Sequence, residues 1–118
     1  MKHIDSNAFE LEFLNFVNHY VKDVGGKGPK RAEVRVAGDT LIYFLRGILT
    51  EREKELIKNP EGRRLVTETR RMFLDLNKEN RMAAFQSFLD CEVIENYESW
   101  DFDNDSAVAV LVLNNKLF

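Results

Sequence analysis

Three short blocks of glycine, proline and helix-capping residues divide the first two-thirds of the chain into separate segments. Residues 25–30 read GGKGPK, residues 45–53 read LRGILTERE, and residues 59–64 read NPEGRR. Glycine ends helices and forms turns, whereas threonine, asparagine and proline mark helix starts. The blocks therefore restrict where helices and strands begin and end, although they display no reaction centre.

The length and composition fit one folded domain. The chain has 118 residues, of which 44% are hydrophobic and 31% charged, as in globular proteins. No apolar run approaches the ~20 residues of a membrane helix, and residues 1–6 lack the apolar core of a signal peptide. We therefore expect one domain over residues 1–118, cytoplasmic and without direct membrane insertion.

The first predicted element is a helix with an aromatic face. Asn7 is a candidate N-cap, with Glu10 as its capping-box partner, and Gly25 is placed to end the helix. Apolar residues recur between these positions at helical spacing. The face that they form must be buried, in this chain or in another; it consists of Phe9, Phe13, Phe16, Val17, Tyr20 and Val24.

A hairpin is predicted next. Residues 32–36 alternate between polar and apolar, and residues 40–49 are rich in β-branched and aromatic side chains. Gly38 and Asp39 between them suit a two-residue type II′ loop. The second strand is apolar on both faces, so we expect it at the centre of a sheet, covered on both sides.

Two helical segments follow the hairpin. Thr50 and Glu53 form a capping box that starts a short helix ending near Asn59, because Pro60 disfavours helical geometry in the residue before it. Residues 62–89 are helical in pattern, with a polar interruption. Unbroken, this segment would measure roughly 42 Å, which is long for so small a domain.

The last third of the chain predicts two strands. Residues 92–102 alternate, with Ile94, Trp100 and Phe102 expected on one side and Val93, Tyr97 and Ser99 on the other. Residues 103–105 form a turn, and residues 107–113 read as a buried central strand. The order α-β-β-α-α-β-β predicts an α+β fold: a four-stranded, mainly antiparallel sheet with helices packed on one face.

Two groups of basic residues are the candidate contacts for a partner or an anion. A glycine loop with lysines can hold an anion, but the loop at 25–30 lacks Walker spacing and follows a helix, which favours a turn. Two arginine pairs lie seven residues apart on one helix flank, where Glu61 and Glu68 can neutralise them. The candidates are Lys27, Lys30, Arg31, Arg63, Arg64, Arg70 and Arg71.

The remaining reactive residue types predict no catalytic, cofactor or metal site. His3 and His19 lack partners at metal-ligand spacing, and the aspartates of residues 101–105 lack the glycine and glutamate of a calcium loop. Acidic neighbours raise the pKa of the Cys91 thiol, and a lone cysteine excludes an intrachain disulfide. Net charge of −3 and aromatics assigned to the core disfavour nucleic acid.

Charge is segregated along the chain. Residues 27–71 contain twelve Lys/Arg and seven Asp/Glu, a net charge of +5, whereas residues 90–105 contain seven Asp/Glu and no Lys/Arg, a net charge of −7. Such polarity can align two copies or guide a charged partner. Together with the aromatic first helix and the long helical segment, it predicts a homodimer.

The order and spacing of residues 26–30, 45–53 and 60–63 resemble those of the MpsC family. The resemblance covers roughly residues 9 to 113 and implies a single MpsC-like domain. The family consists of small bacterial proteins of the membrane-potential-generating, inorganic-carbon transport system Mps. It implies two partners, an antiporter-like membrane subunit and a large carbonic-anhydrase-like soluble subunit, and it supplies no catalytic residues.

Two functional hypotheses from different classes follow. The first is a non-enzymatic accessory subunit of a cation-coupled bicarbonate/CO2 uptake and membrane-potential-generating system, which acts through protein–protein contacts. The resemblance would then place this cytoplasmic protein at the inner face of the membrane, held there by partners. The alternative is a free-standing regulatory module that senses a small ligand or anion through the basic residues.

Overall fold

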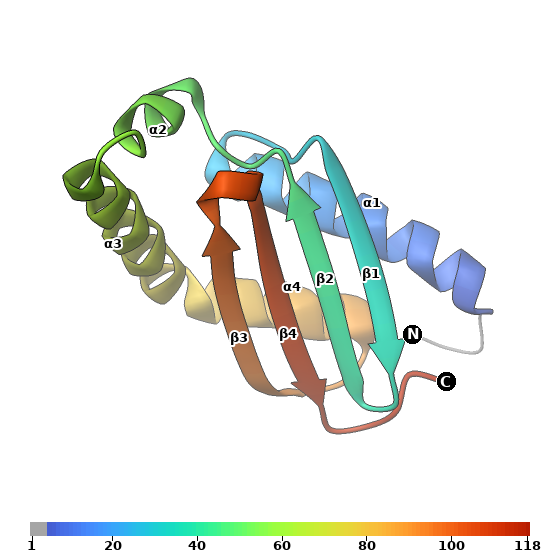
Figure 1. Cartoon of the computed structure of the whole chain (residues 1–118). Helices are drawn as coiled ribbons and strands as arrows, with labels where there is room; N and C mark the ends of the chain where they lie inside the picture. The colour runs from blue at the N-terminus through green and yellow to red at the C-terminus, as the bar shows by residue number, and fades with distance from the viewer. Residues whose placement is uncertain (1–4) are drawn as a thin grey trace.

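The computed structural model describes residues 5–118 and has an α+β fold (Figure 1). All strand pairs of its four-stranded sheet are antiparallel, with the order β1-β2-β4-β3. The predicted fold class is therefore confirmed. The elements are α1 (Ser6–Gly25), β1 (Arg31–Ala37), β2 (Thr40–Arg46), α2 (Glu51–Leu56), α3 (Pro60–Leu76), α4 (Lys78–Leu89), β3 (Val93–Asp101), a 3-10 turn η1 (Phe102–Asn104) and β4 (Ser106–Leu113).

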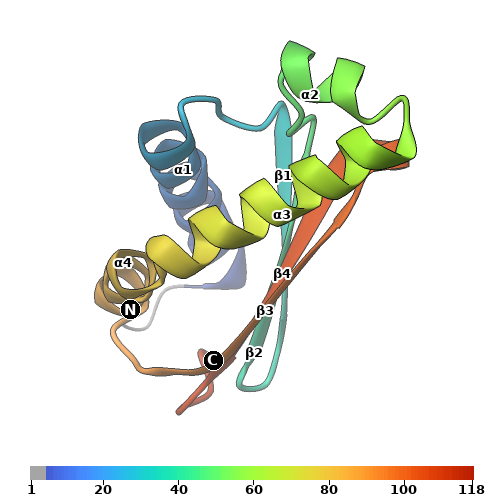
Figure 2. The ribbon, with the colours of Figure 1, turned by 90° about the vertical axis from the view of Figure 1, so that its left-hand side faces the viewer.

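The helices lie on one side of the sheet and at one of its edges. Figure 2 shows α1 and α4 on the same face, while α3 runs from α4 towards α2 past the β3 edge. On the covered face, Val34, Tyr43 and Ala109 are neighbours in the strand register, and all three are buried. The central strands β2 and β4 thus present one side to the helices.

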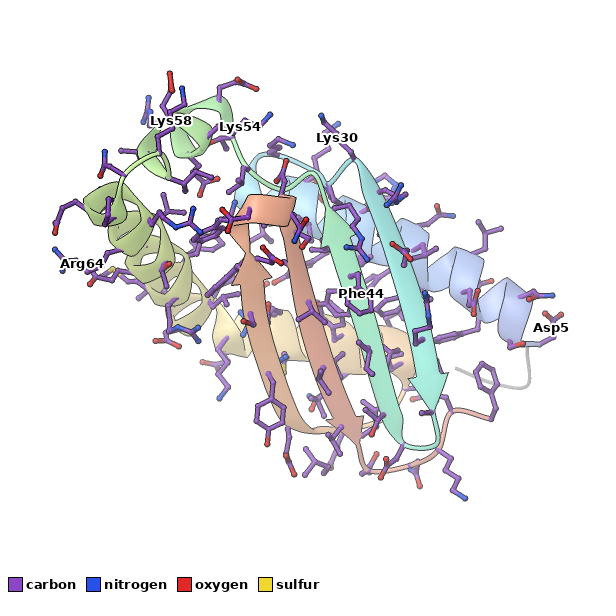
Figure 3. All side chains as sticks on the ribbon, viewed as in Figure 1. Asp5, Lys30, Phe44, Lys54, Lys58 and Arg64 are labelled. Carbon is purple, nitrogen blue, oxygen red and sulfur yellow. The ribbon has the colours of Figure 1, made fainter. Side chains whose placement is uncertain are left out.

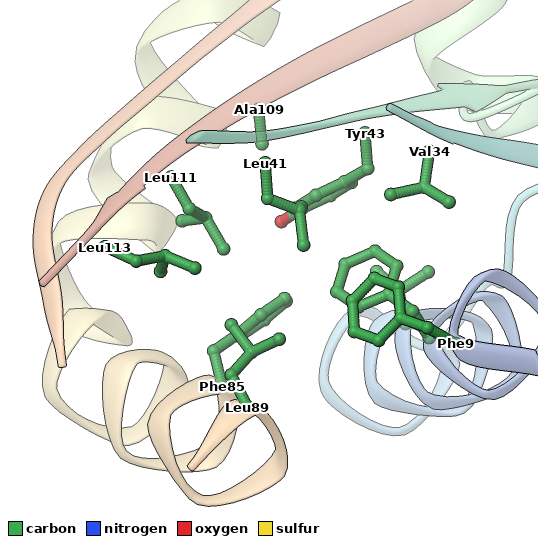
Figure 4. Packing of buried hydrophobic residues seen from close by; sticks show 11 residues of the cluster. Phe9, Val34, Leu41, Tyr43, Phe85, Leu89, Ala109, Leu111 and Leu113 are labelled. Carbon is green, nitrogen blue, oxygen red and sulfur yellow. The ribbon is translucent and has the colours of Figure 1, made fainter. Parts of the chain in front are cut away.

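The aromatic face of α1 is buried within the chain itself. The ring of Phe13 lies 5.5 Å from that of Tyr43 in β2 and 6.2 Å from that of Phe85 in α4. Phe9 and Leu41 complete this layer (Figure 4). The expectation that this face must be buried is met without a second chain, so α1 gives no reason for a homodimer.

The ends of α1 differ from the prediction. Asp5, not Asn7, is the N-cap, because its carboxylate accepts a hydrogen bond from the amide of Ala8 at 2.9 Å. The left-handed residue at the other end is Gly26, with φ of 81°, not Gly25. At each end of α1, two nearby residues are chemically able to cap the helix: Asp5 or Asn7 at the start, and Gly25 or Gly26 at the end. The helix uses the outer residue at both ends and is therefore longer than predicted.

The second strand is shorter than predicted and covered on one face only. It ends at Arg46, because Gly47 turns the backbone with φ of 70° and Asp105 then binds the next two amides. β2 is central, as expected, but Ile42 and Phe44 point away from the helices. No helix of residues 5–118 covers them, so the expected cover on both sides is wrong.

Two predictions that depend on local chemistry are confirmed: the hairpin loop at Gly38 and the helix cap at Thr50. Gly38 has φ of 64° in a two-residue loop between β1 and β2. Thr50 Oγ1 accepts from the Glu53 amide at 3.1 Å, and Glu53 Oε1 accepts from the Thr50 amide at 3.0 Å. Asn59 then caps α3, whose first residue is Pro60.

The long helical segment is broken. Asn77 ends α3 and precedes α4, and its side chain donates to the hydroxyl of Tyr20 at 3.0 Å. The Arg81 guanidinium binds the carbonyl of Leu74 at 2.9 Å, which satisfies a group at the end of α3. The segment therefore folds as two helices, and the length argument for a homodimer is also removed.

The third strand contains an irregularity that reverses two predicted side chains. The register shifts between Val93 and Glu95, so that Val93 packs against the core and Ile94 is 56% exposed. Tyr97 is exposed on the other face from Trp100, as the alternation predicts. A bulge places two successive residues opposite one, which a strict two-residue period cannot anticipate.

Candidate functional site

The seven basic candidates do not meet in one site. Lys27, Lys30 and Arg31 lie at the start of β1, beside Gly47. Three of the arginines of α3 face β3, and Arg70 faces α2 instead. The structure thus separates the glycine-loop group from the arginine flank.

The lysines of the glycine loop have structural roles. Lys27 Nζ donates to the carbonyl of Gly47 at 2.9 Å. The side chain of Lys30 lies so close to Gly47 that a Cβ there would be 2.7 Å from Lys30 Cγ. Arg31 lies 3.9 Å from the carboxylate of Glu33. The loop therefore fixes the end of β2 through carbonyl groups and side-chain packing.

Arg70 is the centre of a polar clip between α2 and α3. Its guanidinium contacts both carboxylate oxygens of Glu53, at 2.7 and 2.9 Å, and the carbonyl of Ile48 at 3.2 Å. Burial alone would raise the pKa of Glu53, but hydrogen bonds from Arg70 and Thr50 outweigh it and the pKa is lowered. Arg70 is thereby satisfied inside the chain and is not available to a partner.

The other three arginines of α3 line a cleft of about 520 Å³ between α3 and β3. Arg63 binds Asp103 at 3.0 Å, and Arg64 binds Glu61 at 2.8 Å. The guanidinium of Arg71 lies 4.9 Å from the centre of the Trp100 ring, a cation–π contact. The cleft is lined by Arg63, Arg64, Thr67, Arg71, Ser99, Trp100, Asp101 and Phe102.

Arg71 differs from its neighbours in this cleft. Among residues 5–118 it forms no ion pair with a carboxylate, although its charge acts on the buried Glu98. An exposed guanidinium over an aromatic ring can receive an anion or a carboxylate from outside. The cleft therefore has one available cation among three arginines.

A buried ion pair escaped the sequence analysis. Arg81 of α4 is 6% exposed, and its Nε lies 3.2 Å from Glu98 Oε2 in β3. Arg81 also donates to Asn96 at 3.3 Å. Burial raises the pKa of Glu98, and the Arg81 charge acts in the opposite direction. Polar residues at inward positions of an alternating strand were the available signal, and the pair joins α4 to β3.

The acidic hairpin tip has one structural role for each aspartate. Asp101 accepts from Asn104, Asp103 binds Arg63, and Asp105 accepts from the amides of residues 48 and 49, both at 2.8 Å. The Asp101 pKa is lowered by its hydrogen bonds to Asn104. The three carboxylates point to different partners, which explains why this tip resembles a calcium loop only in composition.

The other reactive groups show no constellation in the described part of the chain. Residues 5–118 contain no group of three or more His, Cys, Asp or Glu able to hold a metal. Burial, followed by the Asp90 charge, raises the pKa of the Cys91 thiol. His19 is exposed on α1, and His3 lies outside the described residues.

Two apolar surfaces are left uncovered. The first, which we call the open face, is the side of the sheet opposite α1 and α4. Figure 3 shows Phe44 on this side. Its apolar residues are Ile42, Phe44, Tyr97, Val108, Val110 and Val112.

The second surface, the α3 stripe, lies along one side of α3. Its members are large and highly exposed: Leu65 52%, Met72 62%, Phe73 43% and Leu76 81%. In residues 5–118 no helix combines the length and apolar character needed to cross a membrane. Contiguous apolar side chains of this kind mark interaction sites.

The fold and these surfaces define a small α+β protein with uncovered apolar faces. The chain belongs to the family described as "Na+-translocating membrane potential-generating system (MpsC)", whose sequence profile matches residues 6–115. It is also similar to "Uncharacterized protein YrhF" of Bacillus subtilis (strain 168), with 23% identity over 107 residues, 90% of this chain and 88% of that protein. No solved structure matches.

Proposed function

We propose that this protein is a non-enzymatic accessory subunit of the Mps membrane-potential-generating system and acts through protein–protein contacts. Family membership connects the chain to that system. The observation that carries the contact mechanism is the α3 stripe, where Met72 and Leu76 are 62% and 81% exposed. An apolar helix side of this spacing fits a hydrophobic groove on another protein.

The proposal includes the transported substrate and the partners. The system couples cation flow to bicarbonate or CO2 uptake, and this subunit is a homodimer at the cytoplasmic face of the membrane. It contacts an antiporter-like membrane subunit and a large soluble subunit with carbonic-anhydrase-like features. The α3 stripe is the docking surface for one of these two subunits, because it lies away from the main core.

A deletion strain complemented with variants tests this function. Deletion should impair growth at ambient CO2 and lower the membrane potential, and added bicarbonate or CO2 should restore growth. Leu76→Asp should fail to complement, because a charge on the α3 stripe prevents burial against a groove. Leu11→Asp, at a 64% exposed position of α1, is the matched control and should complement. Unchanged growth and membrane potential after deletion would refute the proposal.

A second function, a module that senses an anion, is supported by the cleft of Arg63, Arg64 and Arg71. A ligand that binds only the folded state must raise its thermal stability. We expect no saturable shift in melting temperature with phosphate, nucleotides or bicarbonate if the subunit only binds proteins. A saturable shift that Arg71→Ala abolishes and Lys27→Ala retains would favour the sensor.

A further inference from the structure

We infer that two copies of this chain form the homodimer by stacking their open faces, with the two-fold axis parallel to the strands. This inference names the surface of the homodimer included in the proposed function. It does not use the α3 stripe, which remains free for another subunit. The occupant of the open face is therefore a second copy of the same sheet.

The centre of the open face is a continuous apolar surface. In the strand register Ile42 lies beside Val110 and Phe44 beside Val108, so the two central strands contribute adjacent side chains. α1 and α4 lie on the other side of the sheet (Figures 1 and 2). Two such faces stack at about 10 Å separation, as in β-sandwiches. A second sheet would thus cover what the chain itself leaves exposed.

The two edges of the open face carry opposite charge. On the β1 side, Arg31, Arg35 and Arg46 surround the single carboxylate of Glu33 at 3.0 to 3.9 Å, which leaves a net charge of +2. On the β3 side, the residues on the same face are Glu95, Tyr97, Ser99 and Asp101, with a net charge of −2. The face is therefore basic at one edge, apolar at the centre and acidic at the other edge.

This arrangement decides between the two simple ways of stacking two copies. A two-fold axis across the strands would place the basic edge against the partner's basic edge. An axis parallel to the strands places the basic β1 edge over the partner's acidic β3 edge, twice in each dimer. Like charges brought together disfavour association, whereas opposite charges favour it. Only the parallel axis makes the open face complementary to itself.

The strand register adds a row-by-row match. Rotation about an axis parallel to the strands leaves each residue at the same level along them. Arg31 shares its level with Asp101, through Arg46 and Ser106. It would therefore face the partner's Asp101.

The outward row beyond that of Glu33 and Ser99 gives a second pairing. Arg35 shares its level with Tyr97, through Ile42 and Val110. It would lie over the ring of the partner's Tyr97, an arrangement that favours a cation–π contact. Both pairings join a basic β1 residue to a β3 residue that suits it.

Charge reversal with rescue tests the inference on the full chain. Light scattering should give the wild type a mass of 27.6 kDa, twice the 13.8 kDa of one chain. Arg35→Glu and Tyr97→Arg, at positions that the register places opposite each other, should each alone weaken dimerisation by about tenfold or more. The double variant should recover it. β1 and β3 are opposite edges, three strand spacings or ~14 Å apart, so recovery must come from contact between copies.

An apolar variant and its control complete the experiment. Val110→Lys should abolish the dimer, whereas Leu65→Lys, on the α3 stripe, should leave it intact; circular dichroism checks that both fold. A monomeric wild type, a dimer insensitive to these changes, or one broken by Leu65→Lys would overturn the inference. If the monomeric variants complement the deletion strain, the accessory function does not require the dimer. If the wild type is a dimer but deletion causes no growth defect, the dimer forms and the proposed function is wrong.

Discussion

The molecule contains two packed regions that are held together by different means. The main core joins α1 and α4 to the sheet through large apolar side chains, among them Phe9, Phe13 and Phe85. The corner formed by α2, the start of α3 and η1 has a cluster of only four buried residues, Ile48, Leu49, Val66 and Phe102. The apolar cluster at the corner is the smaller of the two, so other interactions contribute more to holding the corner together.

Polar groups supply those interactions at the corner. The Arg70–Glu53 clip, the Thr50 capping box and the two amides bound by Asp105 all lie around the small cluster. In the main core, aromatic rings contact one another over 4.5 to 6.3 Å. A small apolar cluster thus depends on named hydrogen bonds, whereas a large one depends on packing.

The largest expected effect is a cavity in the main core. Phe13→Ala removes a fully buried ring that contacts Phe9, Tyr43 and Phe85. It should lower the free energy of unfolding by about 3–5 kcal/mol, measured by chemical denaturation. Leu11→Ala, on the exposed side of the same helix, is the control and should change it little. A small effect of Phe13→Ala would show that the core is not the more tightly packed region.

The next effect concerns a close backbone approach at the corner. A Cβ added to Gly62 would lie 1.7 Å from the carbonyl oxygen of Leu56. Gly62→Ala must therefore separate α2 from α3 and should cost about 1–3 kcal/mol, as overpacking does. Gly25→Ala, also in a helix but with no atom within 4 Å, should be neutral or slightly stabilising. Equal effects of both changes in thermal unfolding would contradict this account.

A third effect tests the cap at the corner. Thr50→Ala removes the acceptor for the Glu53 amide at 3.1 Å. It should reduce stability by roughly 1 kcal/mol, with Thr50→Ser as the variant that keeps the hydroxyl. Hydrogen exchange should show faster opening of α2, while the main core keeps its protection. Loss of protection throughout the sheet would mean that the two regions open together.

The sequence predicts those parts of both regions that depend on neighbouring residues. The capping box of Thr50, the loop at Gly38 and the start of α3 at Pro60 follow from local chemistry, and the structure confirms them. Hydrophobic periodicity likewise predicts the aromatic face of α1. These features need only a few consecutive residues to specify them.

Other features depend on residues distant in sequence. The end of β2 is set by Asp105, some 57 residues away from Ile48, and the burial of Arg81 depends on Glu98. Spacing alone places the four arginines of α3 on one flank, but Arg70 turns to Glu53 while Arg71 turns to Trp100. Two adjacent residues on a helix point in directions about 100° apart, and which neighbour each meets is set by tertiary packing.

The smallest expected effect is a difference in the pH dependence of the two regions. The pKa of Glu53 is lowered by Arg70 and Thr50, in spite of burial, so the folded state binds fewer protons there. Its contribution to stability is present above the ordinary value of 4.5 and is lost as pH falls through the folded pKa. The pKa of Glu98 is raised by burial, so its contribution is present below 4.5 and is lost as pH rises through the folded pKa.

The two carboxylates therefore oppose each other, and glutamine substitution separates them. Denaturation between about pH 3.5 and 7 should give Glu53→Gln a shallower rise of stability with pH than the wild type. Glu98→Gln should give a steeper one, because it removes the group whose protonation stabilises the folded state. Glu98→Gln also leaves Arg81 buried without its anion, so the slope against pH, and not the absolute stability, is the quantity to compare. We expect burial to dominate at Glu98 and hydrogen bonding to dominate at Glu53. If both substitutions shift the slope of stability against pH in the same direction, this expectation is wrong.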